Sequence, residues 1–123
     1  MIDIIKINKI AIQSRRWAMR NRNKFNCDKS LAGMCGIASA YLHKSLTRNE
    51  IRSVIAVNDE HVFIVIDEYI IDITATQFGK KSICIVEIDK VNDYFWNICN
   101  KFSSVDDLRE YQKNELWPID QIV

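Results

Sequence analysis

Glycine is scarce in this chain of 123 residues, which contains only Gly33, Gly36 and Gly79. Neither G-x-G-x-x-G nor G-x-x-x-x-G-K-[ST] can be written from glycines at these positions, so the fingerprints of dinucleotide-binding and P-loop proteins are absent. Long apolar runs are absent too. The longest is Val62–Ile66, far short of the roughly 18 residues that a membrane-spanning helix needs. The sequence therefore gives no reason to expect a membrane protein.

The N-terminus lacks the pattern of a signal peptide. Its apolar residues are interrupted by Asp3, Lys6 and Lys9, whereas a signal peptide needs an uninterrupted apolar stretch. The sequence predicts a protein that stays in the cytoplasm, or one that is exported by a route without a cleaved signal.

Paired cysteine motifs are also missing. Cys27, Cys35, Cys84 and Cys99 form no C-x-x-C and no Cys/His pair with metal-ligand spacing, so neither a zinc site nor any other cofactor is expected. A disulfide framework does not suit a cytoplasmic chain of this size. The sequence predicts free thiols, and the question becomes whether one of them is reactive.

Composition is that of a globular protein, with 48% hydrophobic and 27% charged residues, and the length predicts one domain over residues 1–123. A net charge of +1 gives no global reason to expect nucleic acid as a partner. The basic residues are concentrated at the N-terminus, where Arg15, Arg16, Arg20, Arg22 and Lys24 surround Trp17. This segment is either a solvated helix face or a contact surface for an acidic partner or phosphates.

Hydrophobic periodicity divides the chain into helices at both ends and strands between them. We expect helices over residues 2–24, with a break near Gln13, and from Met34 onward, with a loop at 26–33 between them. Strands are expected at 52–57, 61–66, 69–74 and 82–88, with Asp67 and Glu68 forming a two-residue turn. Strands that are adjacent in sequence predict an antiparallel sheet, and the whole an α+β domain.

Three further features complete the expected organisation. Thr47 and Glu50 have the spacing of a capping box, which predicts a short helical turn after them. Residues 91–102 fit either a helix or a loop. Ser104 is a suitable N-cap for a helix over 105–113, and Trp117-Pro118 ends the regular structure.

Cys35 is the best candidate for a nucleophile. It is expected in the first turn of the second helix, where unpaired N–H groups and the helix dipole favour a thiolate. Gly36 beside it lets a substrate backbone approach closely, and the Cys35 N–H could donate to an oxyanion.

A nucleophilic thiolate needs an imidazole partner, which in turn needs an orienting group. His43 is expected about 12 Å along the same helix from Cys35, so it cannot serve, whereas His61 opens a strand. If Asp67 and Glu68 form a two-residue turn, His61 and Asp72 lie diagonally on one face of the hairpin. A carboxylate in the apolar run around Asp72 is costly unless it is paired, and a histidine partner would explain it.

Two segments resemble the core of papain-like and transglutaminase-like cysteine enzymes. They are Gly33-Met-Cys35-Gly-Ile-Ala-Ser39 and His61-Val-Phe-Ile-Val-Ile-Asp-Glu-Tyr-Ile-Ile-Asp72-Ile-Thr-Ala-Thr-Gln-Phe78. The resemblance covers residues 31–79 and runs in the order Cys, His, Asp. It implies that Cys35 is the nucleophile, His61 the general base and acid, and Asp72 the orienter of His61.

Other parts of that family pattern are not clearly marked. The chain is short for a papain-type peptidase. Asn26 and Gln13 are candidates for a side-chain oxyanion donor, although both fit ordinary polar positions. Gln77 is expected to bond a loop backbone near the site.

The sequence supports two hypotheses of different classes. In the first, the chain is a cysteine hydrolase or acyltransferase that acts on an amide bond of a protein or peptide, by peptide cleavage, glutamine deamidation or acyl transfer. In the second, it is a non-catalytic papain-like binding module whose contact surface is the basic N-terminal segment. Neither the substrate nor the oligomeric state follows from the sequence.

Overall fold

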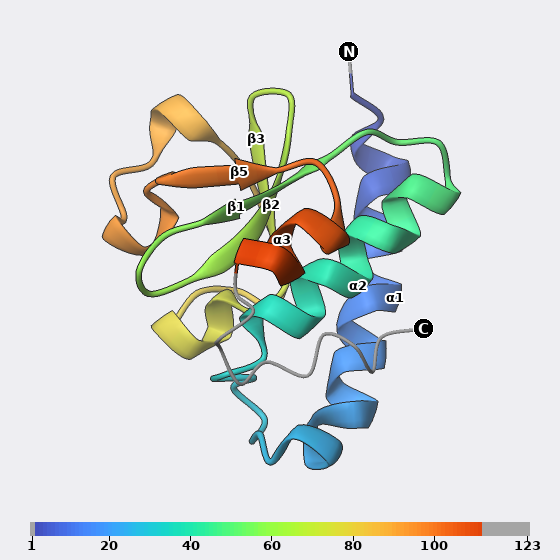
Figure 1. Ribbon diagram of the computed structural model, residues 1–123, viewed down its shortest axis with the longest axis vertical. Coiled ribbons are helices and arrows are strands. Elements are labelled where there is room, and N and C mark those ends of the chain that lie inside the picture. Colours follow the sequence, from blue (N-terminus) through green and yellow to red (C-terminus); the bar gives the residue numbers. More distant parts are fainter. Residues whose placement is uncertain (1, 112–123) are drawn as a thin grey trace.

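Helices cover one face of an antiparallel sheet, as Figure 1 shows for the computed structural model of the protein, which describes residues 2–111. The expected α+β class is confirmed. The helices are α1 (Ile4–Asn21), α2 (Cys35–Arg48) and α3 (Val105–Tyr111), and the strands are β1 (Val54–Val57), β2 (Val62–Ile66), β3 (Tyr69–Asp72), β4 (Cys84–Glu87) and β5 (Asn100–Phe102). Short 3₁₀ turns lie at Arg22–Phe25, Ala75–Phe78, Ile88–Lys90 and Tyr94–Trp96.

The strand order is β4-β3-β2-β1-β5, and every neighbouring pair is antiparallel. Ile66 pairs with Tyr69 across the turn between β2 and β3, so the expected two-residue turn at Asp67 and Glu68 is confirmed. Asp67 has a φ of 51°, the left-handed conformation that tight hairpin turns use. This register decides which face each side chain of the hairpin occupies.

Side chains on the two faces of the sheet belong to two different apolar clusters. On the helical face, Ile64 and Ile71 join a cluster with α1 and α2 residues such as Ile7 and Leu42. On the opposite face, Phe63 packs with aromatic side chains from the segment after β4. Because strands alternate in period two, His61 and Asp72 share the parity of Phe63 and belong to this aromatic side.

The first helix is continuous, contrary to the expected break near Gln13. Its N-cap is Asp3, which accepts from the backbone N–H of Lys6 at 3.1 Å. Ser14 is buried, and its hydroxyl donates to the Ile10 carbonyl at 2.8 Å. A serine bonded in this way is satisfied within the helix and need not interrupt it.

The prediction of a capping box at Thr47 and Glu50 is wrong. Thr47 lies inside α2, where its hydroxyl donates to the His43 carbonyl at 2.9 Å. The helix ends at Arg48, and Glu50 has a φ of 60°, so no helical turn follows. Periodicity over α2 outweighs the local Thr-x-x-Glu spacing.

The C-terminal part is partly as expected. Residues 91–102 are neither one helix nor one loop, because they contain a 3₁₀ turn and the edge strand β5. The Ser104 hydroxyl accepts from the Asp107 N–H at 3.1 Å, which confirms the N-cap of α3. The predicted end of this helix at Lys113, and Trp117-Pro118, lie outside the described residues. Within residues 2–111 no helix is long and apolar enough to cross a bilayer.

Candidate active site

Cys35 is the first residue of α2, as the sequence predicted. The preceding residue, Met34, makes no side-chain cap hydrogen bond, so the backbone N–H groups of the first turn are not capped by it. Leu31 and Gly33 reach this point through left-handed conformations, with φ of 62° and 87°. Such a conformation in a buried leucine is strained, and strain of this kind clusters at functional sites.

A hydrogen bond fixes the start of α2 against the start of β2. Ser39 lies one helical turn after Cys35, is 3% exposed, and donates from its hydroxyl to the Val62 carbonyl at 3.1 Å. Val62 directly follows His61 in the chain. This contact therefore brings the nucleophile's helix and the histidine's strand together, a role for Ser39 that sequence reasoning did not identify.

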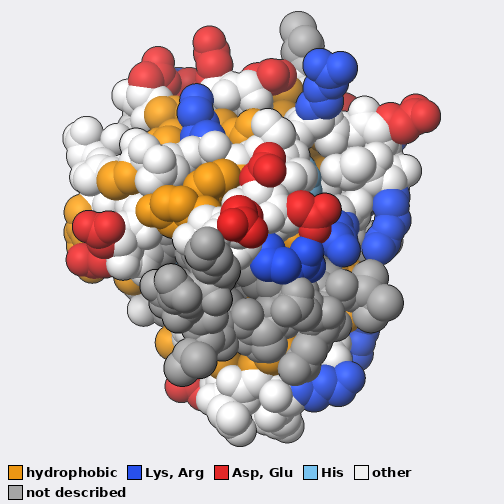
Figure 2. Space-filling view, in the orientation of Figure 1, with side chains coloured by type: hydrophobic (Ala, Val, Ile, Leu, Met, Phe, Trp, Pro, Cys, Tyr) orange, Lys and Arg blue, Asp and Glu red, His pale blue; other side chains and the backbone are white. Residues whose placement is uncertain are grey.

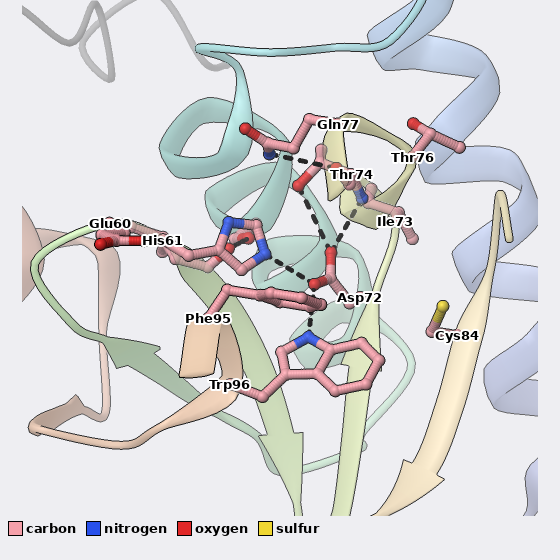
Figure 3. A network of polar contacts seen from close by, with 12 residues as sticks. Glu60, His61, Asp72, Ile73, Thr74, Thr76, Gln77, Cys84, Phe95 and Trp96 are labelled. Carbon is pink, nitrogen blue, oxygen red and sulfur yellow. Dashed lines mark hydrogen bonds and ion pairs between the residues drawn. The ribbon is translucent and has the colours of Figure 1, made fainter. Parts of the chain in front are cut away.

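His61 is held by the turn that precedes β2. The Asn58 side-chain oxygen accepts from the backbone N–H groups of Glu60 and His61, at 2.8 and 2.9 Å. The imidazole is buried, and its Nε2 lies 2.6 Å from Oδ2 of Asp72, as Figure 3 shows. The contact predicted from the hairpin register is confirmed.

Both oxygens of Asp72 have partners. Oδ1 accepts from the backbone N–H of Thr74 at 2.9 Å and from its hydroxyl at 3.3 Å. Oδ2 accepts from the indole Nε1 of Trp96 at 2.8 Å, in addition to its contact with His61. A carboxylate that is 1% exposed is stable in an apolar strand only with such partners. Trp96 was not identified from the sequence.

The environment of His61 favours its protonated form. Burial alone lowers its pKa, but the hydrogen bonds and charges of Asp72 and Cys35 outweigh burial and raise the pKa to about 9. Because Cys35 contributes to this shift, we infer that its thiol lies near the imidazole. Since Nε2 is bonded to Asp72, we assign Nδ1 as the nitrogen that faces the thiol. Among residues 2–111 Nδ1 has no hydrogen-bond partner, and loose contacts are common at catalytic sites before substrate binds.

Aromatic rings pack around the histidine. The ring centroid of Phe78 lies 4.9 Å from that of His61 in an edge-on arrangement, and that of Phe63 lies 5.7 Å away. Phe95 stacks on Phe78 at 4.2 Å. These rings exclude water from the His61–Asp72 pair and restrict rotation of the imidazole, while Tyr94 beside them is 59% exposed.

Arg15 points inward. It is therefore not part of a solvated helix face, which was one of the two interpretations of the basic segment. Its Nη1 donates to the Ile73 carbonyl at 2.6 Å and to the Thr76 hydroxyl oxygen at 3.3 Å. Thr76 in turn donates to the Ser30 carbonyl at 2.8 Å. The guanidinium thus ties α1 to the segment after Asp72, and Thr76 ties that segment to the loop before Cys35. Trp17 is half-buried and stacks on Tyr41 at 4.1 Å.

The expected accessory residues fall into two groups. Gln77 donates from Nε2 to the Thr74 carbonyl at 3.1 Å, the backbone contact near the site that was predicted. Asn26 and Gln13 are both exposed, and among the described residues no hydrogen bond joins either to Cys35 or His61. The structure therefore offers no support for them as oxyanion donors.

His43 is separate from the site, as expected. It is buried in α2, and its Nδ1 lies 2.7 Å from the Ser53 hydroxyl. Burial lowers its pKa. A cleft of about 830 Å³ lies beside it, lined by residues that include Thr47 and Lys101.

The four cysteines are free thiols. Burial raises the pKa of Cys27 and of Cys84, so these two thiols are poor nucleophiles near neutral pH. Within residues 2–111 no group of three His, Cys, Asp or Glu side chains is placed to hold a metal ion.

Comparison with known proteins leaves the class of this protein to be argued from its residues. No family model, curated protein or solved structure matches the chain. Its likeness to papain-like and transglutaminase-like enzymes therefore stays a prediction, based on the residues quoted above.

Proposed function

We propose that this chain is a cysteine hydrolase or acyltransferase that acts on an amide bond of a protein or peptide. The observation that carries the proposal is the buried His61, which contacts Asp72 through Nε2 while Cys35 lies beside its ring. A pair of this kind supplies a base for the thiol and an orienter for the base. A purely structural histidine would not need both neighbours.

The proposed reaction passes through a thioester. The Cys35 thiolate attacks the amide carbonyl, and the resulting oxyanion faces the uncapped N–H groups at the start of α2. The intermediate collapses, the C–N bond breaks, and protonated His61 gives its proton to the leaving amine. His61 then takes a proton from water, which attacks the thioester and releases the acid and the thiol. An amine in place of water gives acyl transfer.

The raised pKa of His61 fits the acid step. With a pKa of about 9, the imidazole is protonated in the resting site near neutral pH and can donate to the leaving amine. Asp72 stabilises this imidazolium and fixes its orientation through Nε2. Trp96 and Thr74 hold the carboxylate in place.

The deciding experiment compares wild-type protein with Cys35→Ala in a protein extract, by mass spectrometry of the extract's peptides. Wild type alone should generate new peptide termini, a mass gain of about 1 Da at glutamine, or new isopeptide crosslinks, which separate cleavage, deamidation and acyl transfer. Ser104→Ala serves as a control remote from the site. Identical extracts after wild-type and Cys35→Ala treatment would favour the non-catalytic binding module.

A further inference from the structure

We infer that the outer side of α1 binds an acidic peptide segment that carries an aliphatic side chain. The surface, here called the α1–β4 surface, is formed by Ile12, Arg16, Met19, Arg20, Ser82 and Ile83. These residues surround a cavity of about 380 Å³ between α1 and the segment that leads into β4. The inference rests on charge and shape and is independent of the proposed enzymatic activity.

The positive charge of this surface is not compensated within the described residues. Arg16 and Arg20 are exposed, lie one helical turn apart, and make no hydrogen bond or ion pair with residues 2–111. Like charges at this spacing destabilise a helix. None of the described residues that line the cavity is acidic. Figure 2 shows basic side chains along the right-hand edge of the molecule, where α1 and part of α2 lie in Figure 1.

The cavity between the guanidinium groups is apolar. Ile12, Met19 and Ile83 supply aliphatic and thioether surface to it, and its volume is near the lower end for ligand pockets, which begin at about 300 Å³. It fits one or two aliphatic side chains. The described part of the chain contributes no aromatic ring to it, whereas single-stranded nucleic-acid sites are built on aromatic stacking platforms.

One of the guanidinium groups that line the cavity, that of Arg15, is held in place by hydrogen bonds. Arg15 also lines it, but its hydrogen bonds to the Ile73 carbonyl and to Thr76 hold it inward. Figure 3 shows Ile73 and Thr76 on the α1 side of Asp72. The two exposed cations of this surface are therefore Arg16 and Arg20, which can each take a carboxylate in a two-pronged contact. A Leu, Ile or Met flanked by Asp or Glu matches this arrangement.

The test is fluorescence anisotropy of the full chain with a fluorescein-labelled peptide, Glu-Asp-Leu-Leu-Asp-Glu. We expect saturable binding that weakens at least about tenfold between 50 and 500 mM salt, because exposed charges are screened. The double variant Arg16→Glu, Arg20→Glu should bind at least about tenfold more weakly. A matched variant, Arg52→Glu with Lys101→Glu, makes the same change of net charge at exposed positions outside α1 and should stay within about threefold of wild type. Circular dichroism verifies that both variants are folded.

A second peptide, Glu-Asp-Ser-Ser-Asp-Glu, tests the apolar cavity and should bind at least about tenfold more weakly than the leucine peptide. Equal binding of the two peptides, or equal weakening by the matched variant, would overturn the inference, as would no binding at 1 mM peptide. Tighter, Arg16- and Arg20-dependent binding of a single-stranded oligonucleotide or of anionic lipid vesicles would also overturn it and assign the surface to that partner.

Discussion

Trp96 and Asp72 are joined by a hydrogen bond of 2.8 Å from the indole Nε1 to Oδ2, the oxygen that also contacts His61. The indole therefore shares the carboxylate's negative charge with the imidazole. It also closes the aromatic side of the pair, since Trp96 is 5% exposed. Trp96 is thus a positioning residue, which acts on the reaction through Asp72 and His61.

Replacing Trp96 with Phe keeps an aromatic ring and removes the donor. Oδ2 then interacts with His61 alone, so the pKa of His61 should rise, and the alkaline limb of the activity profile should move to higher pH. Loss of a buried hydrogen bond to a charged group should cost about 1–3 kcal/mol of unfolding free energy. An unchanged alkaline limb, with stability lowered, would show that Trp96 has only a packing role.

Cys35→Ala and His61→Ala should each abolish turnover almost completely. The double variant should cost little more than either single change, because residues that act as one unit are not additive in their effects on rate. Turnover of a substrate found in the extract experiment provides the measurement. Two independent losses that multiply in the double variant would contradict a shared mechanism.

Asp72→Asn should be milder than either of those changes, with turnover reduced about 10- to 1000-fold, because Trp96 and Thr74 still hold the side chain. The variant removes the negative charge that raises the pKa of His61. The alkaline limb of activity should therefore shift downward from about 9. An Asn variant whose pH profile matches that of wild type would remove Asp72 from the electrostatics of the site.

The raised pKa of His61 also predicts how stability depends on pH. The folded pKa of about 9 exceeds the unfolded value of about 6.5, so protonation of His61 favours the folded state. This contribution is fully present below about pH 6.5 and is lost as pH rises through about 9. Urea unfolding at pH 6, 7.5 and 9 should show a fall of roughly 1–3 kcal/mol in wild type and a smaller fall in Asp72→Asn.

Thiol reactivity separates Cys35 from the other cysteines. Near pH 6, iodoacetamide should label Cys35 ahead of Cys27, Cys84 and Cys99, because only Cys35 has both a helix N-terminus and a protonated imidazole beside it. Cys35 is 6% exposed, so a small reagent is required. Peptide mapping after brief labelling gives the order, and His61→Ala should remove the preference. Preferential labelling of Cys99 in wild type would count against an activated Cys35.

The hairpin and its two polar residues were predictable because local rules determine them. β-branched runs on both sides of Asp67-Glu68 fix the turn, and period-two alternation then places His61 and Asp72 on one face. The position of Cys35 followed from helical periodicity after a loop. Each of these inferences uses residues that are close in sequence.

Tertiary partners were not predictable in this way. Trp96 lies 24 residues from Asp72, inside a segment whose pattern fits either a helix or a loop. Arg15 looked like one of several solvent-facing cations, and only the packing of α1 shows that it turns inward. The edge strand β5 was missed because Asn100-Lys101-Phe102 is too short and polar to carry a strand pattern.

The turn at Asp67 and Glu68 lies at the opposite end of β2 from His61, and both of its residues are exposed. We therefore expect covalent change to be tolerated at this end of the sheet and to be harmful at the end that carries His61. A circularly permuted protein opened at this turn, or one with a reporter inserted there, would keep Cys35, His61 and Asp72 on intact segments. A domain that changes conformation, inserted at that turn, could then control the activity of Cys35.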